Sequence, residues 1–234
     1  MDWQGQYLTP DEWVAVRLTL GVAARSVGFG LPVAVLTALL LSGSRFPGRA
    51  LVDALVHLPL VVPPVVTGWL LLLVFGLHGP VGAWLQGTFG IRLVFTTAGA
   101  SLACAVMSFP LMVRAERLSL DAVDQGLHDA ARTLGAGPVD RLFSITLPLA
   151  APGIVVGALV GFAASLGEFG AVITFAANIP GETQTLPLAI YSALQSPGGE
   201  ATAARLSLVS VAFAVVGLLA ADFADRRLRL RLAA

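Results

Sequence analysis

The sequence predicts an all-α integral membrane protein that forms a single domain over residues 1–234. Hydrophobic residues make up 56% of the chain and charged residues only 12%, and the mean hydropathy is +0.84. Soluble domains carry about 25% charged residues, so this composition is typical of a chain that lies in a bilayer. Long apolar segments recur along the sequence, and turns rich in glycine, proline and arginine separate them.

Five apolar segments are expected to span the membrane: residues 13–41, 51–76, 95–113, 147–168 and 203–221. The first follows Thr9 to Glu12, which has the form of a capping box with proline at the first helical position. The second contains Pro59, Pro63 and Pro64, which predict a kink or a broken helix. Pro110 is expected to interrupt the third near its end.

The region of residues 169–200 leaves open whether a sixth span forms. Residues 169–177 are apolar but too short to cross a bilayer alone, and residues 187–195 predict a short helix on or partly in the membrane.

The fourth span carries small residues at four-residue intervals: Gly153, Gly157, Gly161 and Ser165. This stripe permits close approach of another helix, either within the chain or across a homodimer contact. Glu168 lies about 30 Å from Pro148 along a helix axis, and therefore near the far end of the span. It is a candidate gate residue together with Pro63 and Pro64, or else an interfacial residue in contact with water.

The arginines predict the orientation of the chain, which contains no lysine. Ten of the fourteen positive residues lie in the first loop, in residues 114–146 and in the C-terminal tail, whereas the opposite connections carry only Arg92 and Arg205. By the positive-inside rule, the long loop and the C-terminus are cytoplasmic and the N-terminus is outside. Arg25 lies deeper in the first span, where it either snorkels, pairs at a subunit contact or has a function.

The polar segment of residues 114–146 contains a short predicted helix. Its apolar positions recur at intervals of three and four residues: Leu127, Ala130, Ala131 and Leu134. Asp124 is expected to cap its N-terminus, Gly135 to end it in the left-handed conformation, and a second helix to start at Pro138. The apolar face is too small to form a core alone, which suits a helix that sits in a groove of another protein.

The same segment resembles the cytoplasmic loop of ABC-importer permeases. That family carries Glu-Ala-Ala, three residues, Gly, nine residues and Ile-x-Leu-Pro. Here Asp129-Ala130-Ala131, Gly135 and Ile145-x-Leu147-Pro148 fall at the same intervals, with aspartate in place of glutamate. Several further motifs resemble molybdate-transporter permeases: Phe46-Pro47-Gly48, residues 57–64, residues 107–114, residues 131–136, residues 167–171 and residues 178–183.

The resemblance implies a type I ABC importer permease core in the cell inner membrane. It further implies a homodimer, two copies of a cytoplasmic ATPase subunit and an extracytoplasmic molybdate-binding protein. The residues expected to contact the ATPase are Leu127, Asp129, Ala130, Ala131, Arg132, Leu134 and Gly135. The chain lacks a phosphate-binding glycine loop with lysine, so ATP hydrolysis is expected on the partner, and no cofactor, metal, catalytic residue or nucleic acid is expected here.

Other classes of function remain as alternatives. Sulfate and tungstate are the competing substrates, since all three anions are tetrahedral dianions. An intramembrane enzyme would use Ser165 or Ser108 with His57 or His78, at intervals that match no nucleophile motif. A receptor or structural membrane protein would not need the loop pattern.

Overall fold

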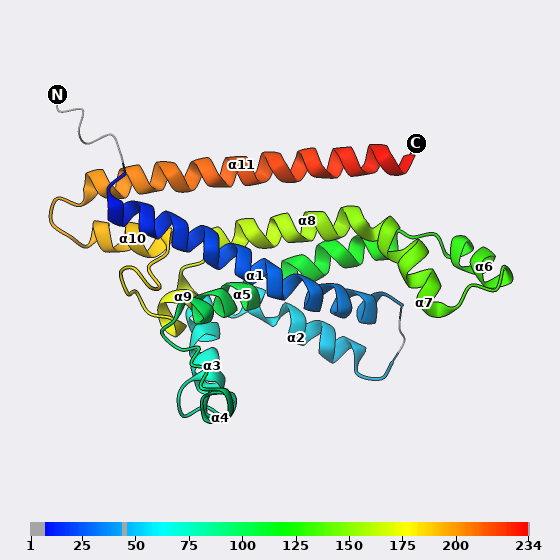
Figure 1. The fold of residues 1–234 in the computed structure, drawn as a ribbon, viewed down its shortest axis with the longest axis horizontal. Coiled ribbons are helices and arrows are strands. Elements are labelled where there is room, and N and C mark those ends of the chain that lie inside the picture. The colour runs from blue at the N-terminus through cyan, green and yellow to red at the C-terminus, as the bar shows by residue number, and fades with distance from the viewer. Residues whose placement is uncertain (1–7, 44–45, 234) are drawn as a thin grey trace.

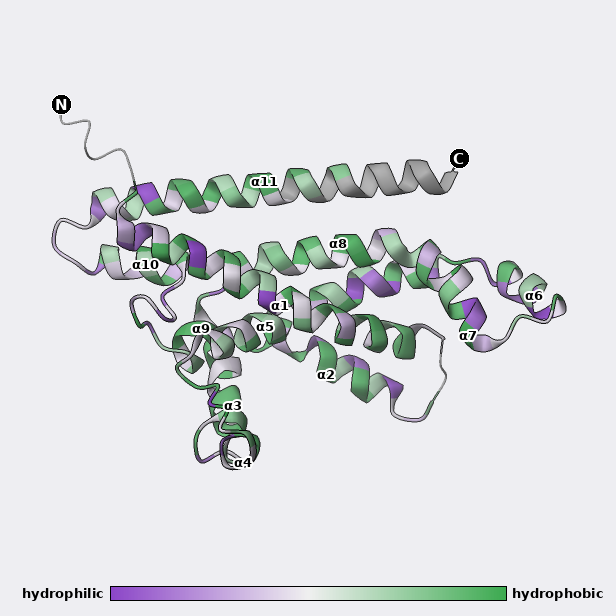
Figure 2. Ribbon diagram, viewed as in Figure 1, coloured by the Kyte–Doolittle hydropathy of each residue, from purple (hydrophilic) through white to green (hydrophobic). Residues whose placement is uncertain are grey.

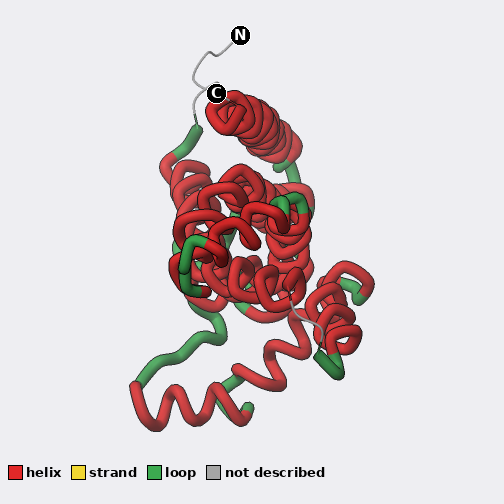
Figure 3. Tube along the Cα trace, turned by 90° about the vertical axis from the view of Figure 1, so that its right-hand side faces the viewer, coloured by secondary structure: helices red, strands yellow, loops and turns green. Residues whose placement is uncertain are grey.

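The computed structural model describes residues 8–43 and 46–233, and this part of the chain consists of helices and loops without a strand. Four long helices run along the molecule (Figure 1): α1 (Pro10–Gly43), α5 (Thr97–Asp121), α8 (Leu147–Leu166) and α11 (Glu200–Ala233). The first three pack together, and α11 lies against α8 at the edge of the bundle (Figure 3). This arrangement confirms the all-α fold class.

Within the described residues, four helical segments are long and apolar enough to cross a bilayer: Pro10–Gly43, Thr97–Asp121, Pro138–Leu166 and Glu200–Gly217. Helices α2 (Arg49–Val61) and α3 (Pro64–Phe75) meet the same test only as a pair, which is bent by 119°. The five membrane spans therefore stay a prediction, and residues 51–76 form a broken element rather than one straight helix.

The capping box at the start of α1 is confirmed. The backbone N–H of Thr9 donates to Glu12 Oε2 at 2.7 Å, and the backbone N–H of Glu12 donates to Thr9 Oγ1 at 3.3 Å. The other carboxylate oxygen of Glu12 accepts from Arg205 Nη2 at 2.7 Å. The same side chain thus caps α1 and ties its first turn to α11.

The helices of this protein contain single prolines but break at a pair. Single prolines lie inside four helices: Pro32, Pro59, Pro110 and Pro152. The interruption expected at Pro110 does not occur, since α5 continues to Asp121. At Pro63–Pro64, both Val62 and Pro63 precede a proline ring, which disfavours helical ψ. Their ψ angles are 136° and 135°, so α2 ends and α3 starts in a new direction.

The remaining helices are short. Helix α4 (Pro80–Phe89) follows α3, whereas α9 (Gly170–Phe175) and α10 (Leu186–Leu194) occupy the region in which a sixth span was left open. Neither α9 nor α10 approaches the roughly 20 residues needed to cross a bilayer. Figure 2 shows continuous hydrophobic stretches on α3 and α8 and hydrophilic patches near α7 and the start of α1.

The small-residue stripe of α8 packs against α5 inside the chain. All four of its members are buried. A Cβ atom on Gly153 would lie 2.2 Å from Ser119 Cβ, and one on Gly161 would lie 2.7 Å from Met112 Cγ. Ser165 Oγ lies 3.0 Å from Ser26 Oγ of α1. Of the two predicted uses of this stripe, the structure therefore places it at a contact within the subunit.

Candidate functional site

Helix α6 (Gln125–Thr133) has the predicted ends. Asp124 Oδ1 accepts from the backbone N–H of Gly126 at 2.8 Å, which confirms the N-cap. Gly135 has a φ of +87°, its N–H donates to the carbonyl of Arg132, and the N–H of Ala136 donates to the carbonyl of Ala131. This pair of hydrogen bonds is a Schellman motif, so the left-handed C-terminal glycine is confirmed as well.

The surface of α6 is open. None of its residues is buried; Leu127 is 46% exposed, and Leu134, which follows the helix, is 88% exposed. The helix projects from one end of the bundle (Figure 1). Arg132 Nη2 lies 3.3 Å from Asp129 Oδ1 in an exposed ion pair between neighbouring turns. The helix is therefore fixed at both ends by its own caps, and its leucine side chain, like that of Leu134 after it, is exposed on the described chain.

The connections to α6 are more helical than the predicted loop of residues 114–146. Helix α5 runs to Asp121, so Arg114 and Arg117 lie on it rather than in a loop. On the other side, α7 (Pro138–Arg141) begins at the predicted proline, and a π-helix (Leu142–Thr146) joins it to α8. Helix α6 is therefore joined to α5 by three residues, and to the continuous helical segment from α7 to α8 by four residues.

An ion pair that the sequence analysis did not predict links this end of the bundle to α2. Arg117 Nη1 of α5 donates to Asp53 Oδ1 of α2 at 2.9 Å, and Arg117 Nε lies 3.7 Å from Asp121 Oδ2. The sequence contained one indication of this pair: Asp53 lies within an apolar segment, where a carboxylate requires a partner.

Of the candidate gate residues, Pro64 packs against the start of α9 (Gly170–Phe175), two residues after Glu168. A Cβ atom on Gly170 would lie 2.7 Å from Pro64 Cβ, and one on Gly68 would lie 2.8 Å from the carbonyl oxygen of Ala171. Helix α3 thus packs on α9 just after the Pro63–Pro64 break. Glu168 follows the end of α8, and its Oε1 accepts from the N–H of Ala171 at 2.9 Å. Glu168 therefore stabilises the start of the helix that receives α3.

The serine and histidine side chains do not assemble a nucleophile. Ser108 Oγ donates to the carbonyl of Cys104, and Ser165 Oγ donates to the carbonyl of Gly161, both at 2.8 Å. His57 Nδ1 lies 2.8 Å from the carbonyl oxygen of Asp53 in its own helix. Within the described residues, neither serine makes a hydrogen bond to a histidine, so this geometry gives no support to the enzyme alternative.

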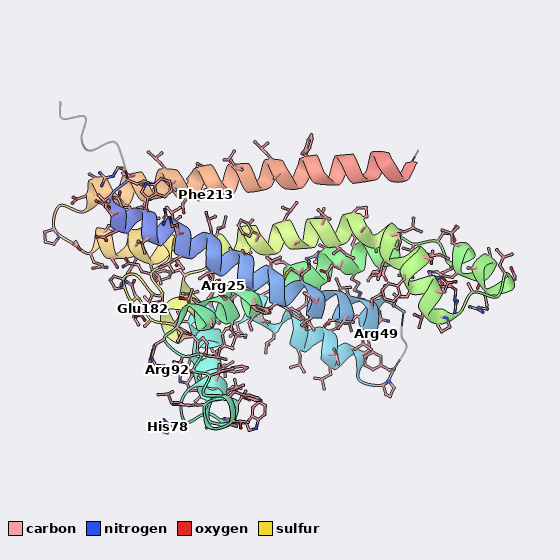
Figure 4. All side chains as sticks on the ribbon, viewed as in Figure 1. Arg25, Arg49, His78, Arg92, Glu182 and Phe213 are labelled. Atoms are coloured by element: carbon pink, nitrogen blue, oxygen red, sulfur yellow. The ribbon has the colours of Figure 1, made fainter. Side chains whose placement is uncertain are left out.

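Part of the charge pattern is visible in the structure. Figure 4 places Arg49 on the half of the molecule nearest α6, and Arg92 on the opposite half. Arg45 lies outside the described residues, and the side chains of residues 224–233, which include the four C-terminal arginines, are likewise not described. The predicted orientation of the termini stays a prediction.

Comparison with known proteins identifies the class. Residues 30–230 match the family model described as "binding-protein-dependent transport system inner membrane component". The chain belongs to this family and is a multi-pass inner membrane protein. It is 55% identical over 219 residues to the molybdenum transport system permease protein ModB of Escherichia coli K12, covering 94% of this chain and 96% of that protein.

More distant relatives extend the comparison. The chloroplastic sulfate permease 2 of Chlamydomonas reinhardtii is 36% identical over 201 residues, which cover 86% of this chain and 54% of that protein. A crystal structure of a bacterial ABC transporter for alginate superposes with a TM-score of 0.73 at 19% identity, covering 98% of this chain and 84% of that chain. At this identity the superposition shows the fold, which is that of an ABC importer permease.

Proposed function

We propose that this chain is the membrane permease of a molybdate importer that is driven by ATP hydrolysis on separate subunits. The observation that carries the proposal is the 55% identity to a molybdenum permease over nearly the whole of both chains. The sulfate permease is less similar and shares a smaller part of its length, so molybdate is the favoured substrate over sulfate. The chain itself forms the translocation pathway and performs no hydrolysis.

The proposed docking element for the ATPase is α6 with its flanking residues Leu134 and Gly135. Three features support this role: the helix has both ends fixed, none of its residues is buried, and its apolar side chains are mostly small. A rigid helix that lies in an ATPase groove follows the motion of that subunit without unfolding. Asp129 and Arg132 are exposed beside this face and are proposed to contact the ATPase.

The proposed route from α6 to the gate runs through helices rather than loops. Movement of α6 displaces α5, and Arg117 of α5 holds Asp53 of α2 at 2.9 Å. Helix α2 leads to the Pro63–Pro64 break, and α3 beyond it packs on α9 next to Glu168. Alternating access is proposed to arise from a change in this bend, which is a gating motion about a membrane cavity.

The complete importer is proposed to contain two copies of this chain, two ATPase subunits and an extracytoplasmic molybdate-binding protein. The long loop and the C-terminus are proposed to be cytoplasmic and the N-terminus to be outside, as the arginine distribution predicts. Selectivity among molybdate, tungstate and sulfate is assigned to the binding protein, since the proposed gate residues are uncharged apart from Glu168.

Uptake in a strain that lacks its own molybdate permease tests the function. Expression of the chain with its ATPase and binding protein is expected to restore uptake of labelled molybdate, with competition by tungstate and little by sulfate. Gly135→Pro is expected to abolish both uptake and co-purification of the ATPase. Transport of sulfate alone would overturn the substrate, whereas unchanged co-purification of the Gly135→Pro variant would overturn the docking role of α6.

A further inference from the structure

Helix α1 carries two arginines that share one pocket. Arg17 and Arg25 line a cavity of about 200 Å³ together with Gly21, Thr97 of α5 and Gly181 of the loop before α10. Positions 17, 21 and 25 follow one another at intervals of four residues, which places them on one face of the helix. Figure 4 shows Arg25 on α1 and Glu182 in the loop toward the N-terminal end of the bundle.

The space between the two arginines is left open by a glycine. A Cβ atom on Gly21 would have no atom within 4 Å, so nothing in the described chain fills the position between Arg17 and Arg25. The side of the pocket opposite α1 is held in place by a hydrogen bond, in which Thr97 Oγ1 donates to the carbonyl of Glu182 at 2.8 Å. The pocket is therefore bounded by two ordered elements and is open at Gly21, between positions 17 and 25 of α1.

The charges of this pocket are not balanced by the described chain. Neither Arg17 nor Arg25 makes an ion pair or a side-chain hydrogen bond with any residue that the structure describes. Both arginine side chains are exposed, and their pocket lies where α5 begins at Thr97, beside the loop that contains Gly181. Two guanidinium groups at one pocket without a described counter-charge favour an anionic ligand.

We propose that this pocket binds a tetrahedral oxyanion of the phosphate or molybdate type, held between Arg17 and Arg25 over Gly21. Guanidinium groups donate paired hydrogen bonds to such oxygens, which makes arginine the preferred residue for this class of ligand. A water molecule occupies about 30 Å³ in the liquid, so the pocket has room for a small oxyanion with part of its hydration shell. A free anion and the phosphate of a lipid headgroup present the same kind of negatively charged oxygen acceptors to the two arginines.

Direct binding to the complete permease–ATPase complex, without ATP, tests the site. Labelled molybdate and inorganic phosphate are titrated into delipidated complex in detergent, and bound phosphatidylglycerol is measured by native mass spectrometry after exchange from phosphatidylglycerol or phosphatidylcholine nanodiscs. Because no transport step is measured, the result is independent of the proposed function. The variants are Gly21→Leu, which fills the pocket, and Arg17→Gln with Arg25→Gln, which remove its charge.

The matched controls are Gly28→Leu on the same helix, where a Cβ also meets no atom within 4 Å, and Arg92→Gln outside the pocket. Both pocket variants are expected to weaken binding at least about tenfold, and both controls to leave it within about twofold. Loss of molybdate or phosphate binding identifies a free-anion site, and loss of phosphatidylglycerol alone identifies a lipid site. Equal binding of all three ligands in wild type, pocket variants and controls would overturn the proposal.

Discussion

Two regions of the molecule are built in opposite ways. Helix α6 has no buried residue and is shaped by its own caps, Asp124 and Gly135. The Pro63–Pro64 break is held by close packing against Gly170, whose missing side chain lets α3 reach α9. The first region is an exposed helix that its own caps complete, and the second is packed within the chain.

This difference indicates where a partner acts and where its action has an effect. A helix without buried residues moves at little cost to the fold, because few buried contacts change with it. A tightly packed contact responds to a small displacement by switching to another packing rather than by deforming gradually. Substitutions at α6 are therefore expected to affect partner binding with little loss of stability, whereas substitutions at the break affect both.

The largest effect is expected at the packed Pro63–Pro64 break. Gly170→Val places a side chain where a Cβ already lies 2.7 Å from Pro64 Cβ and 3.3 Å from the nitrogen of Val65. Overpacking of this kind costs about 1 to 3 kcal/mol, so both the melting temperature and molybdate uptake should fall. Gly167→Val is the control, since its Cβ would meet only the carbonyl oxygen of Ala164 at 4.0 Å. Wild-type uptake in the Gly170→Val variant would show that the contact between α3 and α9 is not part of the gate.

An intermediate effect is expected at the exposed helix α6. Gly135→Ala forces an L-residue to a φ of +87°, which costs about 1 kcal/mol and frays the last turn of α6. Retention of the ATPase should fall, while the melting temperature of the permease should stay nearly unchanged because α6 has no buried residue. Gly137→Ala is the control, since Gly137 has a φ of −71°. A lowered melting temperature with normal ATPase retention would reverse the proposed difference between α6 and the packed break.

The sequence alone predicted those structural features that depend on residues close together in the chain. The caps of α6, the capping box of Thr9 and Glu12 and the break at Pro63–Pro64 each follow from the chemistry of a few adjacent residues. The expected interruption at Pro110 was wrong because the rest of α5 is packed against α1 and α8, and tertiary contacts outweigh the loss of one hydrogen bond.

Contacts between distant segments were not predictable in this way. The Asp53–Arg117 pair joins residues that are 64 positions apart, and it depends on how far α2 and α5 are shifted along each other. The side of α8 on which Gly157 would pack was equally open, because small residues suit a subunit interface as well as an interior contact. Only the structure shows that Gly157 faces Glu116 of α5.

A smaller effect is expected for the ion pair that joins α5 to α2. Arg117→Asp places a third carboxylate beside Asp53 and Asp121, and the double variant with Asp53→Arg restores an opposite pair between positions 53 and 117. Because these side chains are 27% and 40% exposed, the change in unfolding free energy should be only about 0.5 to 1 kcal/mol. Molybdate transported per ATP hydrolysed should fall in the single variant and recover in the double variant. An unchanged ratio in the single variant would remove this pair from the coupling route.

The smallest effect on stability is expected at Asp129. Its ion pair with Arg132 is exposed, with side-chain exposures of 69% and 66%, so it contributes little to the fold. Asp129→Glu keeps the charge and should preserve uptake, whereas Asp129→Arg should uncouple the ATPase from transport at an unchanged melting temperature. Since both variants keep α6 folded, any difference between them reports the contact with the partner alone. Equal uptake would show that the docking surface needs the shape of α6 and not its charge.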